Sequence, residues 1–143
     1  MRGTVKDYMV KEIATIRAEV DIATAARKMA DNPRGYLIVL EEGRPLGMIT
    51  ERNLVNEVLA KGRDPSKIKV SEVTSSPLIV VDPDALLIEA AEIMKKHNVR
   101  KLPVVKDDIL YGIITARDIT DHFRDYVDES IRDVLRWLPT FRV

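Results

Sequence analysis

The length, composition and charge of the chain limit what it can be. It has 143 residues, of which 45% are apolar and 32% charged, and its 23 basic residues are balanced by 23 acidic ones. This length suits one compact domain or two half-sized units that share a core. A general nucleic-acid-binding protein normally carries a basic excess, so the balance argues against that class. With no cysteine in the chain, disulfides, thiol nucleophiles and cysteine zinc sites are excluded.

The sequence contains no recognisable targeting or membrane segment. No apolar run approaches the roughly 18 to 20 residues that span a bilayer. Residues 1–16 also lack the uninterrupted apolar core of a signal peptide. We therefore expect a cytoplasmic protein that makes no contact with a membrane.

The chain contains an internal duplication. Residues 5–54 match residues 70–119 at a constant shift of 65, with no gap. The match is tightest where Gly47, Ile49, Thr50 and Arg52 recur as Gly112, Ile114, Thr115 and Arg117. A gapless repeat of this length indicates two supersecondary units that fold alike and pack on each other.

Each copy is expected to fold in the order β-α-β-β-α, which places the chain in the α/β (α+β) class. Apolar residues at i, i+3, i+4 and i+7 indicate a helix in each copy, and β-prone runs around turn residues indicate a hairpin after it. In the first copy we expect a strand at 13–16, a helix on the stripe Ile22, Ala25, Ala26 and Met29, strands at 36–40 and 46–49 around a turn at 41–45, and a second helix with Leu54, Val58 and Leu59 on its apolar side. In the second copy we expect a strand at 78–81, a helix on the stripe Leu87, Ala90, Ala91 and Met94, strands at 102–105 and 110–114 around Asp107 and Asp108, and a second helix with Ile119, Phe123 and Val127 on its apolar side.

Four segments follow from this pattern. We expect a first unit at 1–60, a polar linker at 61–69, a second unit at 70–125 and a helical tail at 126–143. The tail carries an apolar stripe made of Val127, Ile131, Val134, Leu135 and Leu138. Such a stripe does not identify its partner, so it fits a helix that covers its own core and a helix that contacts another subunit equally well.

One recurring segment could carry chemistry. Residues 47–53 and 112–118 lie where a strand ends and a helix begins, and free N–H groups at a helix start suit an anion such as a phosphate. There Asp118 could accept hydrogen bonds from a ribose diol, and Arg52 and Arg117 could bind phosphate. The same residues also form a plausible capping box, with Thr115 as the N-cap and Asp118 three positions later. The local pattern alone favours capping.

The duplicated region as a whole resembles a tandem pair of CBS domains, named after cystathionine β-synthase. The resemblance covers about residues 5–125. It is carried by the lead-in at 5–9, by Glu89, Ala90, Ala91 and Met94, by the run Lys101, Leu102, Pro103, Val104 and Val105, and above all by the two Gly-x-Ile-Thr-x-Arg-(Asp/Asn) segments. It implies a pseudo-twofold arrangement of the two motifs with two clefts that bind adenosine-containing ligands. It also implies that two such pairs associate into a disc-shaped homodimer.

The resemblance assigns residues from both copies to each cleft. It implies that the first cleft is formed by Thr115, Arg117, Asp118, Lys11, Ile13, Ala14, Tyr36 and Leu37. It implies that the second is formed by Thr50, Arg52, Asn53, Ser76, Leu78, Arg100, Lys101 and Pro103. Asn53 stands where the first cleft has the ribose carboxylate of Asp118, which should weaken diol binding by about 1 kcal/mol or more. The second cleft has the richer basic set, but we rank the first cleft higher.

These observations favour a regulatory, energy-sensing module that binds AMP, ADP, ATP or a relative such as S-adenosylmethionine. We expect no catalysis, no required cofactor and no metal site, because the sequence has no catalytic dyad, metal cluster or glycine-rich phosphate loop. The regulated protein is then expected to be a separate chain. One alternative is a structural dimerisation module without a small ligand. Another is a nucleic-acid accessory that uses the basic residues Lys61, Arg63, Lys67 and Lys69.

Overall fold

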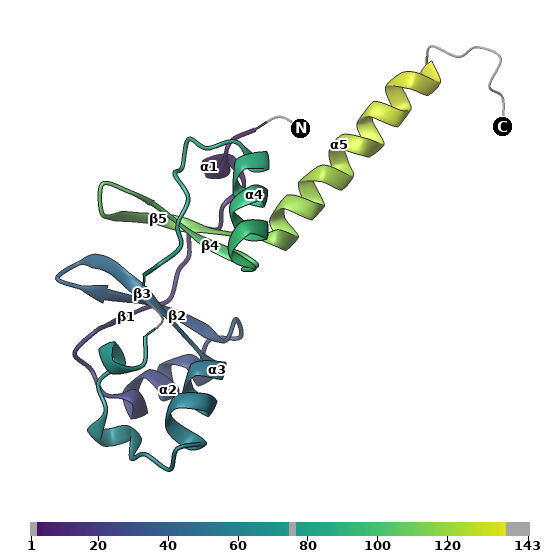
Figure 1. Ribbon diagram of the computed structural model, residues 1–143. Coiled ribbons are helices and arrows are strands. Elements are labelled where there is room, and N and C mark those ends of the chain that lie inside the picture. Colours follow the sequence, from purple (N-terminus) through teal and green to yellow (C-terminus); the bar gives the residue numbers. More distant parts are fainter. Residues whose placement is uncertain (1–2, 75–76, 137–143) are drawn as a thin grey trace.

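The chain folds into two stacked α/β lobes with one long helix projecting from the second (Figure 1). This computed structural model describes residues 3–74 and 77–136, apart from the side chains of residues 125 and 126. In the first lobe, β1 (Thr15–Arg17) runs parallel to β2 (Tyr36–Glu41), and β2 pairs antiparallel with β3 (Arg44–Thr50). The helical elements of this lobe pack around the three strands: α2 (Ile22–Ala30), α3 (Glu51–Leu54) and the π-helical turn η1 (Val55–Leu59). In the second lobe, β4 (Lys101–Lys106) pairs antiparallel with β5 (Ile109–Thr115), flanked by α4 (Leu87–His97) and α5 (Ala116–Arg136). Three short turns complete the described chain: α1 (Val5–Tyr8), η2 (Pro65–Lys67) and η3 (Val70–Glu72).

Each lobe has its own apolar core, and a third cluster joins them. The stripe residues expected on the two helices are buried: Ile22, Ala25 and Met29 in the first lobe, and Leu87, Ala90 and Met94 in the second. Between the sheets, Tyr36, Ile38 and Ile113 form the cluster that packs one lobe on the other. Both hairpins close through two-residue turns with positive φ angles, at 42–43 and at 107–108, which is the favoured geometry for such turns. The first turn is therefore shorter than the expected 41–45.

The expected strand at 78–81 is wrong as a full strand. Only Val81 pairs with the sheet, through a single parallel bridge to Val104. The reason lies in Pro103, which occupies the position of Ile38 in the repeat. Ile38 donates its N–H to Ala14 O at 3.0 Å, whereas proline has no N–H to donate. The second sheet therefore loses the ladder bond that the first sheet has at this point.

The first helical turn of each copy of the repeat packs on the lobe that the other copy forms, and we call this arrangement the exchange of first turns. Val5 belongs to the core of the second lobe, and its repeat equivalent Val70 belongs to the core of the first. The backbone bonds repeat in the same way: Val5 N donates to Ala85 O at 2.8 Å, and Val70 N donates to Val20 O at 2.8 Å. Each lobe is thus completed by a segment from the other half of the sequence.

This exchange also affects the expected linker. Within it, Ile68 is buried in the core of the first lobe, and its carbonyl accepts a hydrogen bond from Ile22 N at 2.8 Å. The end of the segment at 61–69 is thus a structural part of the first lobe, since it carries the chain to the exchanged turn at Val70.

The apolar side of each second helix is only partly buried, which corrects two expectations. In the first lobe Leu54 and Val58 pack on the core, but Leu59 is 70% exposed. The helix widens to a π turn there, with Ala60 N bonded to Val55 O, and this shifts the later side chains around the axis. In the second lobe Ile119 packs on the core, whereas Phe123 is 53% exposed.

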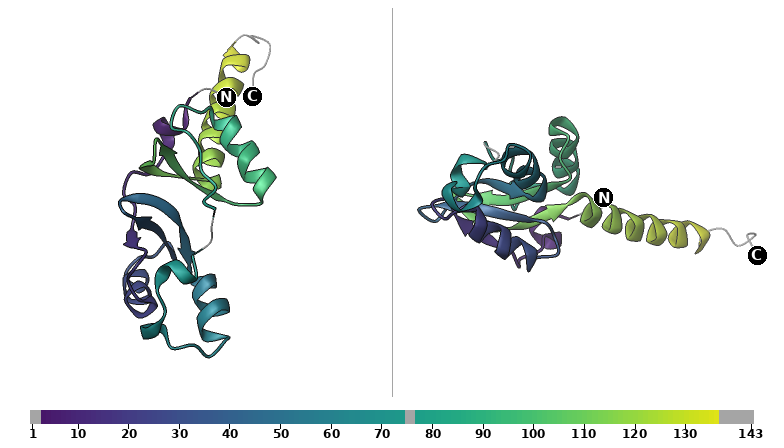
Figure 2. Two further views of the ribbon diagram at one scale, coloured as in Figure 1. Left: turned by 60° about the vertical axis from the view of Figure 1, so that its left-hand side comes forward. Right: turned by 90° about the horizontal axis from the view of Figure 1, so that it is seen from below.

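The long helix α5 leaves the body after its first turns. Figures 1 and 2 show it running past the second lobe with no other segment along its far half. Ile131, Val134 and Leu135 are accordingly about half exposed, so over the described residues the stripe does not cover its own core. The helix is continuous from Ala116 to Arg136, with no break at 125–126. Leu138 and the rest of the expected tail lie outside the described residues.

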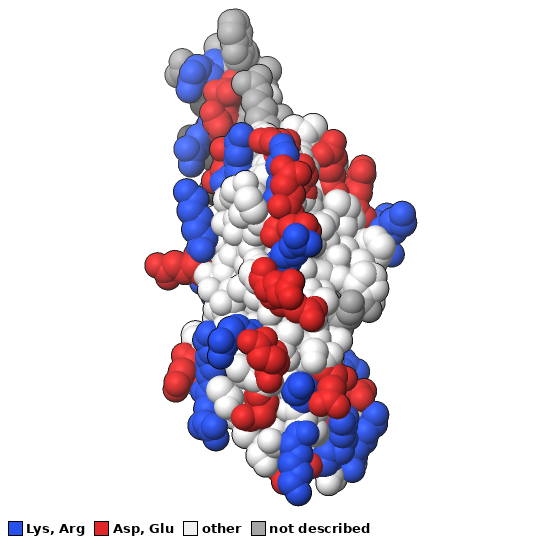
Figure 3. Space-filling view, turned by 90° about the vertical axis from the view of Figure 1, so that its left-hand side faces the viewer, with Lys and Arg blue, Asp and Glu red and all other residues white. Residues whose placement is uncertain are grey.

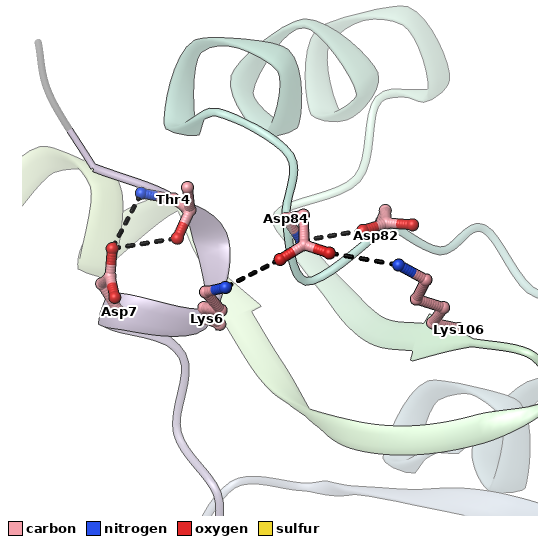
Figure 4. A network of polar contacts seen from close by, with 6 residues as sticks. All are labelled: Thr4, Lys6, Asp7, Asp82, Asp84 and Lys106. Atoms are coloured by element: carbon pink, nitrogen blue, oxygen red, sulfur yellow. Dashed lines mark hydrogen bonds and ion pairs between the residues drawn. The ribbon is translucent and has the colours of Figure 1, made fainter.

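An ion-pair network ties the exchanged turn α1 to the second lobe (Figure 4). Lys6 Nζ donates to Asp84 Oδ1 at 2.8 Å, and Lys106 Nζ donates to Asp84 Oδ2 at 3.1 Å. These hydrogen bonds, first that from Lys6, hold the pKa of the Asp84 carboxyl below its usual value. The same contacts raise the pKa of both lysines.

The stabilising effect of this network is expected to depend on pH and salt. Because the pKa of Asp84 is lowered by folding, its contribution is complete above the ordinary value of 3.8 and is lost as the pH falls through the folded-state value. Urea midpoints of the wild type and of Asp84→Asn should differ at neutral pH and low salt. They should converge in acid and in roughly 1 M salt, because the side chains are about half exposed. A difference between the two urea midpoints that stays constant as pH falls and as salt rises would contradict this role.

Candidate functional site

A long cleft lies where the two lobes meet. It consists of two adjoining cavities of about 720 and 680 Å³ that share Arg34 and Tyr36 in their walls. The larger is lined by Lys11, Glu12, Ile13, Ala14, Asp31, Asn32, Pro33, Arg34 and Tyr36. The smaller is lined by Val10, Arg34, Tyr36, Arg100, Lys101, Ile113, Thr115, Ala116, Arg117 and Asp118. The ends of β2 and β5, the start of α5 and the segment before β1 therefore contribute to one continuous surface.

The cleft brings together all the residues expected in the first cleft except Leu37. That side chain is fully buried in the core of the first lobe. The reason is the alternation along β2: the side chain of Tyr36 lines the cleft, so that of Leu37 points to the opposite face. The cleft also contains Val10 and Arg34, which the sequence did not single out, although Arg34 stands only two positions before Tyr36.

A second, smaller cavity of about 280 Å³, called the second cleft from here on, shares Arg100 and Lys101 with the first cleft. It is lined by Met48, Thr50, Pro77, Leu78, Ile79, Val99, Arg100, Lys101 and Pro103. Five of the residues expected in the second cleft are among them, but Arg52 and Asn53 are not, and Ser76 lies outside the described residues. The expected basic set is not exclusive to this cavity either, because Arg100 and Lys101 also line the first cleft.

The start of α5 has the capping-box geometry that the local pattern favours. Thr115 N and Thr115 Oγ1 both donate to Asp118 Oδ2, at 2.8 and 2.9 Å, and Asp118 N donates to Thr115 Oγ1 at 3.2 Å. Both bonds to the carboxylate end on Oδ2, and Oδ1 accepts no hydrogen bond from the described residues. Capping and ligand binding are therefore compatible, because the cap uses one oxygen and Asp118 also lines the cavity.

The same cap is built with asparagine in the first copy. Thr50 N and Thr50 Oγ1 donate to Asn53 Oδ1, both at 2.9 Å, and Asn53 N donates to Thr50 Oγ1 at 3.2 Å. The helix start is thus equally well satisfied by an amide or a carboxylate. The hydrogen bonds of the cap therefore do not require a carboxylate at Asp118, although the dipole of α5 favours its negative charge.

The polar groups of the first cleft perturb one another. The Lys101 ammonium lies 4.2 Å from the centroid of the Tyr36 ring, in a cation–π contact. Burial raises the pKa of the Tyr36 phenol, Arg34 opposes this shift and Asp118 adds to it. Burial also lowers the pKa of Lys101. The lowered value means that the ammonium is incompletely stabilised by its surroundings, and an anion in the cleft would favour its charged form.

The face that Figure 3 presents has mixed charge, with Lys and Arg side chains interspersed among Asp and Glu in both lobes. Within the described part of the chain, no three His, Asp or Glu side chains are grouped as metal ligands would be. No helix of that part is both long and apolar enough to cross a bilayer.

The fold and the cleft define a class: two α/β units in tandem, related by a pseudo-twofold, with ligand-sized cavities at their junction. A family model described as CBS domain matches residues 5–60 and again residues 70–125. The chain therefore belongs to the CBS domain family and carries the domain twice. Pairs of these domains are generally regulatory and ligand-binding, and typically not catalytic.

Known relatives agree with this assignment. The CBS domain-containing protein YhcV of Bacillus subtilis is 35% identical over 117 residues, which covers 82% of this chain and 83% of that protein. Hypoxic response protein 1 of Mycobacterium tuberculosis is 30% identical over 124 residues, covering 86% and 87%. A crystal structure of Hypoxic Response Protein I with two coordinated zinc ions matches with a TM-score of 0.76 at 30% identity, over 84% of this chain and 98% of that one. A hexameric CBS-CP12 protein from bloom-forming cyanobacteria matches with a TM-score of 0.73 at 30% identity, over 84% and 67%.

Proposed function

We propose that this protein is a regulatory module that binds adenosine-containing nucleotides in the first cleft. The observation that carries the proposal is a carboxylate with one oxygen that the cap does not use, in a cavity lined by several cations. Asp118 Oδ1 offers an acceptor for a ribose diol, and the cavity around it is lined by Arg34, Arg100, Lys101 and Arg117. A carboxylate beside an anion-binding surface matches the two polar ends of a nucleotide.

The position of the cluster supports phosphate as the anion. Asp118 and Arg117 stand in the first turn of α5, a helix of 21 residues. The N–H groups of Ala116 and Asp118 are already bonded to Arg100 O and Thr115 Oγ1, so the support for an anion comes from the helix dipole and the basic side chains. The smaller cavity has four cations and one carboxylate in its wall, and the whole cleft has five cations and three carboxylates. This basic excess also favours AMP, ADP or ATP over S-adenosylmethionine, because the latter carries a positive sulfonium centre.

The proposal is tested by isothermal titration calorimetry of the full chain against AMP, ADP, ATP, S-adenosylmethionine and adenosine. We expect saturable binding of at least one phosphorylated ligand and weaker binding of adenosine. Affinity for the phosphorylated ligand should fall with added salt, because the contacts to the basic side chains are screened. Absence of binding across the whole series would refute the proposed function.

The projecting half of α5 supports a second candidate function, association with a second copy of the chain. Its apolar side chains Ile131, Val134 and Leu135 are about half exposed, and no other described segment runs along this half of the helix (Figure 2). A second copy offers an equal apolar stripe, and two such helices can bury both at once. Homodimerisation through α5 would also put the nucleotide-binding helix start and the subunit contact on one rigid element.

Replacing Ile131 with aspartate is expected to dissociate this dimer without unfolding the lobes. The side chain is half exposed in the single chain, so the folded monomer loses little, whereas a charge placed in a helix pair is costly. Sedimentation velocity should show a dimer for the wild type and for the polar-face control Arg132→Gln, and a monomer for Ile131→Asp. A dimer that survives Ile131→Asp would place the contact elsewhere.

The basic residues considered for nucleic-acid binding support that alternative poorly. Lys61 is ion-paired with Glu57 at 2.7 Å, and Asp64 caps the turn that follows it. The remaining charge is too small for a phosphate-backbone surface, which normally neutralises several phosphates at once.

A further inference from the structure

Two residues at equivalent positions of the repeat contact each other where the lobes meet. Tyr36 and Lys101 are separated by the repeat shift of 65, and the Lys101 ammonium lies over the Tyr36 ring. Tyr36 is buried between the sheets beside Ile38 and Ile113. The contact therefore lies between the two clefts and makes them unlike, because one copy supplies the ring and the other supplies the cation.

The residues just before Tyr36 and Lys101 also differ between the copies, and again only the second copy has a cation. Arg100 corresponds to Gly35, and the backbone bonds are equivalent: Glu51 N donates to Gly35 O at 3.1 Å, and Ala116 N donates to Arg100 O at 2.8 Å. Gly35 has a φ of +73°, and a Cβ there would lie 3.1 Å from the Glu51 carboxyl. A larger residue is therefore disfavoured at Gly35. Only the second copy supplies cations at this pair of positions.

As a result, Arg100 and Lys101 line both clefts. The first cleft also has Arg34 and Arg117 in its wall. Among the described residues that line the second cleft, Arg100 and Lys101 are the only Lys or Arg side chains. The second cleft thus depends for any phosphate contact on two cations that the first cleft can also use.

We propose that the two clefts compete for Arg100 and Lys101, so that a phosphorylated ligand in the first cleft weakens the binding of a phosphorylated ligand in the second. The proposal rests on nucleotide binding as the proposed function. A side chain held by a phosphate in one cleft is withdrawn from hydrogen-bond distance in the other. A cation shared midway would instead bring two anions close together, and their repulsion acts in the same direction.

The competition has a defined size and a defined ligand dependence. One charge-assisted hydrogen bond changes affinity by about tenfold or more, so the two occupancies should be coupled by about that factor. The coupling is reciprocal, as equilibrium linkage requires. Uncharged adenosine does not use the cations, and its binding in one cleft should not affect the other.

Methyl NMR of the full chain can follow the clefts separately, because Ile13 lines the first and Met48 the second. The wild type is compared with Asp118→Ala, in which the first cleft stays empty over the range where the second fills. With AMP, the Met48 midpoint is expected at an about tenfold lower concentration in Asp118→Ala than in the wild type. With adenosine, the Met48 midpoints of the two proteins should agree.

Two further variants separate the possible outcomes. In Arg100→Ala/Lys101→Met, AMP should bind weakly in the second cleft, as followed at Met48, whether or not the first cleft is filled. In the control Lys95→Met, on the exposed side of α4, the Met48 midpoints with and without Asp118→Ala should still differ by about tenfold. An AMP midpoint at Met48 that is equal or higher in Asp118→Ala overturns the competition but leaves nucleotide binding intact. Absence of any shift at both methyl groups with AMP, ADP and ATP alike overturns the proposed function, and the competition with it.

Discussion

Replacing Asp118 with asparagine is expected to weaken AMP and ATP binding to the first cleft by at least about tenfold, with little change in stability. With its one oxygen held in the cap, the amide presents an NH₂ donor where the carboxylate presents its second acceptor oxygen to the ribose, and a charge-assisted bond contributes about 1.5 to 3 kcal/mol. The cap survives, because Asn53 makes the same three bonds in the first copy at nearly the same distances. Calorimetry measures the affinity, and thermal unfolding measures the stability.

Asp118→Ala provides the matched comparison. It removes the ligand contact and the carboxylate half of the capping box, while the N–H of residue 118 can still donate to Thr115 Oγ1. It should therefore lose binding and also destabilise the protein by up to about 1 kcal/mol. If Asp118→Asn bound nucleotides as tightly as the wild type while Asp118→Ala did not, the residue would act only through the helix start. The carboxylate would then have no part in the proposed site.

Val5→Ala is expected to destabilise the second lobe, although Val5 belongs to the first copy of the repeat. The side chain is fully buried among Val81, Leu87 and Leu102, and truncating a buried valine should lower the free energy of unfolding by about 2 kcal/mol. Hydrogen exchange should accelerate first in α4, β4 and β5. Urea unfolding measures the overall loss.

Val70→Ala is the internal control for this exchange. Its side chain is equally buried, but in the core of the first lobe, so faster hydrogen exchange is expected in α2 and β2. Faster hydrogen exchange in the first lobe for Val5→Ala, or in the second lobe for Val70→Ala, would contradict the exchange of first turns.

Much of the fold could be predicted from local pattern, and the failures have local causes. The helices on the Ile22 and Leu87 stripes and both hairpins follow directly from apolar periodicity. The strand at 78–81 was predicted from the β propensity of its residues. It does not form in full because Pro103, on the neighbouring strand, has no N–H to donate. The exposure of Leu59 depends on a π turn, and that of Phe123 on the direction in which α5 leaves the body. Neither can be derived from the spacing of apolar residues.

The candidate site was predictable to a different extent. The helix starts at Thr50 and Thr115 could be located from the repeat. The choice between capping and binding for Asp118 could not, because the cap uses only one oxygen of the carboxylate and leaves the other for the binding that we propose. Strand alternation would have assigned Leu37 to the core. The sharing of Lys101 between clefts depends on how two distant copies pack, which one-dimensional comparison of the copies does not contain.

The exchange of first turns has a consequence for how such a chain can arise. A polypeptide with a single copy would lack the turn that closes its own lobe, so two molecules would have to swap these segments and form an intertwined pair. Joining two such genes end to end would preserve every swapped contact and make it independent of concentration. Fusion would also release the halves from being identical. An asparagine could then replace the acid in one half, and a glycine and tyrosine could stand opposite two cations, without either change appearing twice.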